Sequence, residues 1–311
     1  MCLILTAVCA AGCSAGQQVE FVQDANRVDV TAAGQLVASY RYGSELTKPV
    51  LWPVNTPSGV TVTRSFPLGK EVAGESTDHP HHIGVFFTYD EVNGEGFWNN
   101  TSSPPQVKHA KVAKMQGGDK GTLSTVSQWV GKSGKAMLEE KRDMVFSAGD
   151  SAYVIDFGID LTAQQEKVVF GDTKEGMFAI RVAQWLQEIG DGATAEYLSS
   201  NGDRKEKDVW AKRARWVRLE GKKDGKTVGI AIINKADSVN YPTFWHARGY
   251  GLFSANPLGQ YAFEEARKVE NPQKVNLTLE PGQSAHFAFR MVIYDGARTR
   301  EQIEEYVESR K

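Results

Sequence analysis

Residues 279–293 read Leu-Glu-Pro-Gly-Gln-Ser-Ala-His-Phe-Ala-Phe-Arg-Met-Val-Ile. The Pro-Gly pair predicts a tight turn, and the apolar, partly alternating run after it is typical of a long strand. Residues 153–161 and 228–233 show the same pattern. Shorter runs rich in β-branched and aromatic residues occur at 28–30, 36–42 and 60–63. These segments predict a chain built mainly from strands and turns.

The composition supports an all-β fold. The chain has 311 residues, of which 41% are hydrophobic and 24% charged, so disordered, collagen-like and coiled-coil chains are excluded. Its 30 glycines and 11 prolines supply the turns that short strands need. Only the C-terminal end is convincingly helical, because Thr299 and Gln302 form a capping-box pattern. We therefore expect one large β-sandwich domain over residues 19–311, with a short C-terminal helix.

Charge and hydropathy exclude two classes of protein. Lysine and arginine total 36 against 38 acidic residues, and no basic stripe predicts a nucleic-acid partner. No apolar run approaches the roughly 18 residues of a membrane-spanning helix, so a membrane-spanning bundle is excluded.

The N-terminal segment predicts export. The three cysteines, Cys2, Cys9 and Cys13, all lie in it, so the body holds no disulfide framework and no cysteine-ligated metal. Residues 1–18 carry no charge, and an apolar run leads into Ala-Ala-Gly-Cys, which resembles a lipobox. We expect lipidation at Cys13 and a periplasmic or cell-surface lipoprotein that is tethered to a membrane without spanning it. Plain secretion and a buried first strand are the alternatives.

Three of the six histidines fall within four positions. Residues 78–87 read Asp-His-Pro-His-His-Ile-Gly-Val-Phe-Phe. If this segment is extended, His79 and His81 share one face and His82 points to the other. Two imidazoles on one face are suited to proton transfer on a sugar, or to half of a metal site. The alternative is a polar turn before a buried strand.

Two further segments carry groups that suit a sugar site. Residues 90–98 contain Asn93 and Trp98, and amides and flat rings bind sugar hydroxyls and faces. Residues 172–181 contain Lys174, Glu175 and Arg181, which could supply a base and an anion-binding group. The alternatives are an Asn-Gly hairpin with a core tryptophan and a surface turn with an exposed ion pair.

Residues 241–257 form the other dense cluster. They contain Trp245, His246, Arg248, Tyr250 and Asn256, which combine stacking, titratable and hydrogen-bonding groups. In an extended chain His246, Arg248 and Tyr250 share a face, which favours a functional surface. The alternative is a core strand with a satisfied histidine.

These three separated motifs, at 78–98, 171–182 and 241–257, together resemble a bacterial family often labelled PmoA or methane oxygenase. The resemblance extends from about Val19 to Asp295, and the chain departs from the family pattern at Ile83 and Leu258. The label does not fit, because a particulate methane oxygenase subunit needs several membrane helices. The resemblance implies a β-sandwich related to the galactose-mutarotase-like supersandwich, and such folds commonly host sugar epimerases, lyases and binding modules.

The sequence thus predicts a carbohydrate-binding or carbohydrate-transforming protein that uses acid–base chemistry of the epimerase, lyase or hydrolase type. Catalysis is assigned to His79, His81, Glu175 and His246. Substrate binding is assigned to His82, Asn93, Trp98, Lys174, Arg181, Trp245, Arg248, Tyr250 and Asn256. We expect no cofactor, a sugar or glycan as partner, and contact with membrane through the lipid anchor alone. The alternatives are a non-catalytic sugar-binding module and a cupin-like enzyme with a divalent metal on His79 and His81.

Overall fold

Long antiparallel strands form two eight-stranded sheets in the computed structural model, which describes residues 17–100 and 103–308. The first sheet has the order β1 (Val19–Asp24), β2 (Arg27–Ala32), β3 (Gln35–Arg41), β4 (Val50–Val54), β5 (Val85–Tyr89), β11 (Gly176–Arg181), β16 (Leu252–Asn256) and β15 (Phe244–Ala247). The second has the order β12 (Glu196–Ser199), β13 (Trp216–Lys223), β14 (Lys226–Asn234), β18 (Ser284–Asp295), β9 (Ala152–Ala163), β8 (Ala136–Ala148), β7 (Gly121–Val130) and β6 (Gln106–Gln116).

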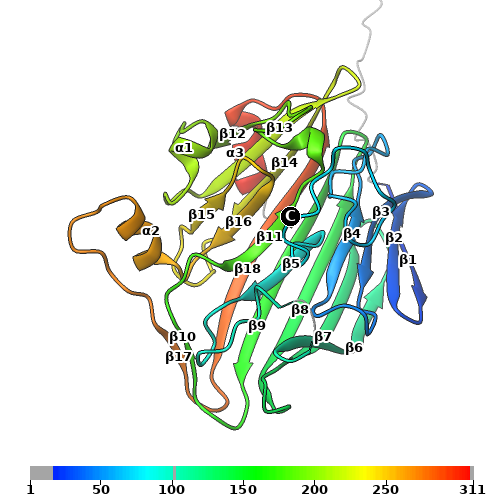
Figure 1. The fold of residues 1–311 in the computed structure, drawn as a ribbon. Helices are drawn as coiled ribbons and strands as arrows, with labels where there is room; N and C mark the ends of the chain where they lie inside the picture. The colour runs from blue at the N-terminus through cyan, green and yellow to red at the C-terminus, as the bar shows by residue number, and fades with distance from the viewer. Residues whose placement is uncertain (1–16, 101–102, 309–311) are drawn as a thin grey trace, which may run out of the picture.

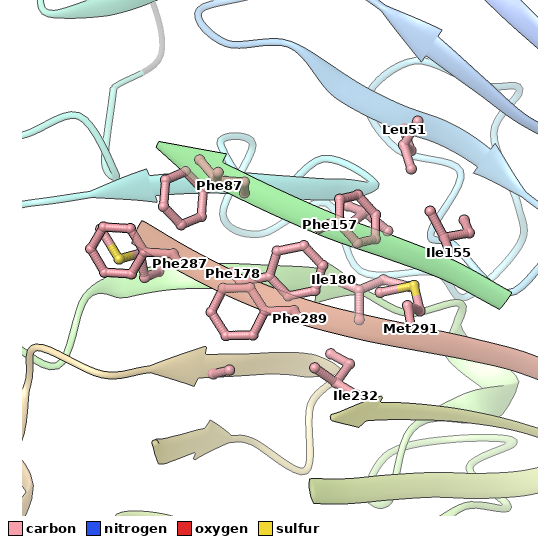
Figure 2. Close-up of a cluster of buried hydrophobic side chains, with 14 of the residues drawn as sticks. Leu51, Phe87, Ile155, Phe157, Phe178, Ile180, Ile232, Phe287, Phe289 and Met291 are labelled. Carbon is pink, nitrogen blue, oxygen red and sulfur yellow. The ribbon is translucent and has the colours of Figure 1, made fainter. Parts of the chain in front are cut away.

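The sheets pack face to face over one main core (Figure 1). Figure 2 shows its centre, where side chains of β5 and β11 meet those of β9 and β18. Phe178 of β11 stacks on Phe289 of β18 with ring centroids 4.6 Å apart, and Phe157 of β9 meets Phe178 edge-on at 4.8 Å. The alternation of β9 is therefore explained by one face buried in this core, whereas β18 is buried on both faces from Phe287 to Tyr294.

The remaining elements are short. A two-stranded sheet pairs β10 (Val168–Phe170) with β17 (Leu277–Leu279). The helices are α1 (Lys205–Val209), α2 (Gln260–Ala266) and α3 (Arg300–Glu308), with a 3-10 turn at Gln184–Leu186. Among the described residues, no helix is both long and apolar enough to cross a membrane.

Four strands of the first sheet are buried on both faces. Every residue of β5, β11, β15 and β16 is buried, although an antiparallel sheet commonly leaves one face to solvent. Their outer face is covered by a second apolar cluster that includes Ile83, Phe86 and Trp98, and by a third in which Phe263 of α2 packs on Phe244 of β15. The outer face of this sheet is therefore an enclosed environment in which polar groups are partly desolvated.

The prediction of an all-β sandwich with a short C-terminal helix is confirmed. The capping box is present, because the Gln302 backbone N–H donates to Thr299 Oγ1 and the Thr299 N–H donates to Gln302 Oε1. Two expectations were wrong. Residues 60–63 form only isolated bridges, and α1 and α2 are helical although the sequence singled out the C-terminal helix alone.

Candidate active site

A single cross-strand row on the outer face of the first sheet organises the candidate site. Phe86 of β5 pairs with Ala179 of β11, Ala179 pairs with Ser254 of β16, and Ser254 pairs with His246 of β15. Figure 1 shows these four strands side by side. Adjacent strands lie about 4.8 Å apart, so His246 and Phe86 are separated by about 14 Å, with two small side chains between them.

The three clustered histidines stand above the Phe86 end of this row. They do not form an extended segment as predicted, because the His82 N–H donates to the His79 carbonyl at 2.9 Å and closes a turn. The turn stacks the His79 ring on His82, with centroids 4.8 Å apart, and brings His81 within 4.4 Å of His82. His82 lies over Phe86 at 5.9 Å. His79 adopts a φ of 44°, a strained value for a non-glycine residue.

A buried arginine holds this turn in place. Arg64 is fully buried and donates to the carbonyls of Asp78, His79 and His82 at 2.7–2.9 Å. Asp78 Oδ1 accepts from Arg64 and from Arg181, while its Oδ2 contacts His79 Nδ1 at 2.7 Å. Burial raises the pKa of Asp78, but Arg181 and the hydrogen bonds outweigh it, so the pKa falls below its usual value. An ionised Asp78 accepts a hydrogen bond from the Nδ1–H of His79. The Nε2 of His79 is then left to accept a hydrogen bond from a ligand.

His246 is held as a neutral imidazole at the other end of the row. Its Nδ1 lies 2.8 Å from the Lys174 carbonyl, which only accepts, so Nδ1 donates and Nε2 carries the lone pair. Burial lowers the pKa of His246 to about 4, against a smaller opposing effect of Glu175. Among the described residues, Nε2 has no hydrogen-bond partner. His246 is therefore unprotonated at neutral pH and can accept a proton from a molecule that reaches its buried Nε2.

His81 has the same electrostatic character. Burial, followed by the positive charge of Lys48, lowers the pKa of His81 to about 4, and Glu175 opposes the shift. Its Nε2 is buried and unpartnered within the described chain. The Glu175 charge raises the pKa of both His81 and His246 against the effect of burial, so the carboxylate acts on both imidazoles. The assignment of His81, Glu175 and His246 to one catalytic group stays a prediction.

The segment that carries Glu175 is held in place by hydrogen bonds to the Tyr89 hydroxyl. Tyr89 of β5 donates to the Gly171 carbonyl at 2.7 Å and accepts from the Thr173 N–H at 3.0 Å. At its outer end Lys174 Nζ contacts Glu175 Oε1 at 2.9 Å, in an ion pair whose side chains are 48% and 24% exposed. Such a pair adds little stability. Glu175 therefore stays accessible on a rigid support.

Lys48 is a site residue that no sequence motif singled out. It is buried, and its Nζ donates to the Trp98 carbonyl at 3.3 Å and to Asn100 Oδ1 at 3.2 Å. The ammonium also lies 5.0 Å from the Phe86 ring centroid. Burial lowers the pKa of Lys48 to about 7. A lysine with such a pKa is suited to hold or release a proton near His81.

Tyr250 joins the two halves of the site. Its ring stacks on His79 at 5.5 Å, and the guanidinium carbons of Arg181 and Arg248 lie 4.7 and 5.5 Å from its centroid. Arg181 is fully buried, with Nε and Nη1 unpartnered among the described residues. Arg248 is partly exposed and donates through Nε to Glu206 at 2.7 Å. Arg248 and Tyr250 thus belong to the site, while Arg181 supports it from beneath.

Four residues assigned to substrate binding have structural roles instead. Trp98 and Trp245 are fully buried, so neither ring can stack on a sugar. Asn256 donates to the Thr173 carbonyl and accepts from two backbone N–H groups. Asn93 lies in an Asn-Gly hairpin, where its amide bonds the chain around 167–169. These four predictions were wrong, because aromatic and amide residues satisfy packing and turn geometry as readily as a ligand.

The metal alternative is not assembled in the described part of the chain. No group of three or more His, Cys, Asp or Glu side chains within 17–100 and 103–308 is placed to hold a metal ion. His79 and His81 meet with ring centroids 5.7 Å apart and an interplanar angle of 70°, and His79 Nδ1 is engaged by Asp78. Cys13, the predicted lipidation site, lies outside the described residues.

Comparison with known families assigns the chain. A model described as a family of unknown function, DUF6807, matches residues 27–308. The chain belongs to this family. The PmoA name suggested by the sequence resemblance is not part of that description. No curated protein matches the chain.

Solved structures show distant likenesses. A galactose mutarotase-like protein from Clostridium acetobutylicum is 11% identical with a TM-score of 0.40, over 90% of this chain and 99% of that one. A galactose mutarotase related enzyme from Lactobacillus acidophilus is 11% identical with a TM-score of 0.30, over 90% and 98%. A beta-arabinopyranosidase is 13% identical with a TM-score of 0.34, and this chain spans only 38% of it. These likenesses are too distant to transfer residue roles.

Proposed function

We propose that this DUF6807 protein binds a carbohydrate on the outer face of its first sheet and transforms it by acid–base catalysis. The observation that carries the proposal is the pair of buried imidazoles, His81 and His246, whose Nε2 atoms have no hydrogen-bond partner among the described residues and which both respond to the charge of Glu175. Each offers an unpartnered Nε2 in a desolvated setting. Groups whose protonation is tuned by burial and by a shared charge are typical of catalytic sites.

The roles follow from the geometry. One imidazole takes a proton from the sugar, at a hydroxyl or at a carbon next to a carbonyl, and gives it back as the imidazolium, while Glu175 acts as the paired base whose negative charge stabilises that imidazolium. Arg248 stabilises an oxyanion or a carboxylate through the guanidinium N–H groups that Glu206 does not use. His79, oriented by Asp78, binds a hydroxyl group at the exposed edge. Such chemistry is of the epimerase, lyase or hydrolase type.

The test combines binding and turnover. A thermal-shift panel of neutral and acidic sugars identifies a ligand, because a molecule that binds the native state raises Tm. On that ligand, His246→Gln and Glu175→Gln are expected to lower kcat by about 10²- to 10⁴-fold while binding persists. Lys135→Gln, at an exposed turn, is the control and keeps full turnover.

Two outcomes would change the proposal. Unchanged turnover in both variants would refute the acid–base assignment. Sugar binding without turnover of any ligand would favour the non-catalytic binding module. Such a module needs only exposed polar groups and has no need for imidazoles with a lowered pKa.

We also propose that the protein is an exported lipoprotein with Cys13 as the lipidation site. The lipobox-like Ala-Ala-Gly-Cys sequence supports this. Mass spectrometry of the membrane fraction is expected to find an N-terminal peptide that begins at Cys13 and carries a diacylglyceryl group. Full recovery of a Cys13→Ala variant in the membrane fraction would contradict it.

A further inference from the structure

A pocket of about 430 Å³ adjoins the candidate active site on the His246 side. It is lined by Glu206, Lys207, Trp210, Arg248, Ala266 and Arg267. Its walls come from α1, from the turn after β15 and from the end of α2, which lie on one side of the molecule (Figure 1). Its volume falls in the range of small-molecule sites.

Two residues of the pocket lining contact residues of the candidate active site. The ring of Trp210 meets that of His246 edge-on, with centroids 6.3 Å apart. The Arg248 guanidinium carbon lies 5.7 Å from the Trp210 ring centroid and 5.5 Å from that of Tyr250, so one arginine borders both regions. A ligand held over Trp210 would therefore present its neighbouring atoms to His246.

The lining carries an excess of positive charge. Its one acidic residue, Glu206, is already used, because Oε1 accepts from Arg248 Nε at 2.7 Å and Oε2 accepts from the Gly249 N–H at 2.8 Å. Lys207 is exposed and adds a further positive charge. Three cationic residues thus face a single neutralised carboxylate.

Arg267 has a free edge toward this pocket. Its Nε donates to the Trp210 carbonyl at 3.0 Å and its Nη2 donates to the Lys207 carbonyl at 2.9 Å, both neutral acceptors. Its guanidinium carbon lies 5.8 Å from the Trp210 ring centroid, nearly the same distance as that of Arg248. Both guanidinium groups therefore lie close to the same indole ring, and their remaining N–H groups suit an anion such as a carboxylate or a phosphate.

We propose that this pocket binds an acidic sugar unit, with its anionic group between Arg248 and Arg267 and its ring against Trp210. The inference rests on the proposed function and gives its substrate class, a sugar that bears a carboxylate or a phosphate. An indole face and paired guanidinium groups recognise these two features separately.

The test is a titration of the full chain with glucuronate, glucose 6-phosphate and glucose at low ionic strength. We expect at least one acidic sugar to bind about tenfold or more tightly than glucose, because charged hydrogen bonds add affinity. The better of the two acidic sugars identifies the anionic group. Equal affinity of the wild-type protein for all three would overturn the inference.

Two variants locate the effect. Arg267→Gln and Lys207→Glu are expected to reduce the preference for the acidic sugar, and Lys207→Glu leaves the hydrogen bonds of Arg267 intact. Arg298→Gln is the matched control, since Arg298 also lies over a ring, at 5.3 Å from Tyr294, on another part of the molecule. A preference that survives both pocket variants would refute the site.

The two proposals fail differently. Binding of glucose with no preference for acidic sugars, together with turnover that depends on His246, would refute the pocket alone. A preference for acidic sugars with turnover that is unaffected by His246→Gln would refute the catalytic assignment alone.

Discussion

Replacing His246 by glutamine should remove a measurable part of the acid sensitivity of the fold. His246 is 2% exposed, and burial lowers its pKa from 6.5 to about 4. Below pH 6.5 the unfolded chain therefore gains a proton at this position that the folded chain does not bind. The contribution of His246 to the free energy of unfolding is therefore fully present above its pKa in the unfolded chain. It is lost as the pH falls toward its pKa in the folded chain.

The magnitude follows from the two pKa values. Linkage gives a loss of about 2 kcal/mol in the free energy of unfolding between about pH 7.5 and about pH 5 from this one group. The loss approaches about 3 kcal/mol at still lower pH, because each pKa unit corresponds to about 1.4 kcal/mol. Glutamine does not titrate, so His246→Gln should lose about 2 kcal/mol less than wild type over this range.

Urea denaturation followed by tryptophan fluorescence at the two pH values measures the difference. Ser254→Ala is the control, because it removes the hydrogen bond of the neighbouring Ser254 hydroxyl to the Gly176 carbonyl without removing a titratable group. It should lower stability equally at both pH values. An acid-induced loss in His246→Gln as large as that of wild type would refute a buried, neutral imidazole.

Three further predictions concern stability and metal content. Glu140→Gln leaves Arg142 buried beside a neutral partner and should cost about 3 kcal/mol by urea denaturation, whereas Glu139→Gln on the same strand should cost under about 0.5 kcal/mol. Thr299→Ala removes the cap of α3 and should cost about 1 kcal/mol, and an unchanged Tm would contradict the capping role. Protein purified without chelators should contain no stoichiometric transition metal, and an equivalent that disappears in His79→Ala would support the metal alternative.

The sequence predicted the long strands well and the enclosed strands poorly. In β9 the inward residues meet one core while their neighbours stay partly accessible, so the pattern is visible. In β18 the residues from Phe287 to Tyr294 are all buried, and the strand is recognised by its long apolar run. In β5 and β11 both faces are buried, and Phe86 looks no different from Phe87 although they face opposite cores. A one-dimensional pattern does not separate two burial environments.

The candidate site was partly predictable for a similar reason. His79, His81 and His246 stand out because histidine is uncommon and occurs here in dense motifs. Arg64 and Lys48 were missed, because their roles arise only when distant segments come together. The Arg64 guanidinium, for example, reaches carbonyls 14 to 18 positions along the chain.

The strand order of the first sheet has a consequence for how the site forms. β11 lies between β5 and β16, so the row from Phe86 to His246 joins segments that are about 90 and 75 positions apart in the chain. Non-local pairings of this kind form late and slowly during folding. A fragment must span at least residues 86–254 to contain the whole row, and loss of any one of these strands dismantles it. Ligand binding should therefore require the complete first sheet. We expect partly folded or truncated chains to show no ligand binding in any assay.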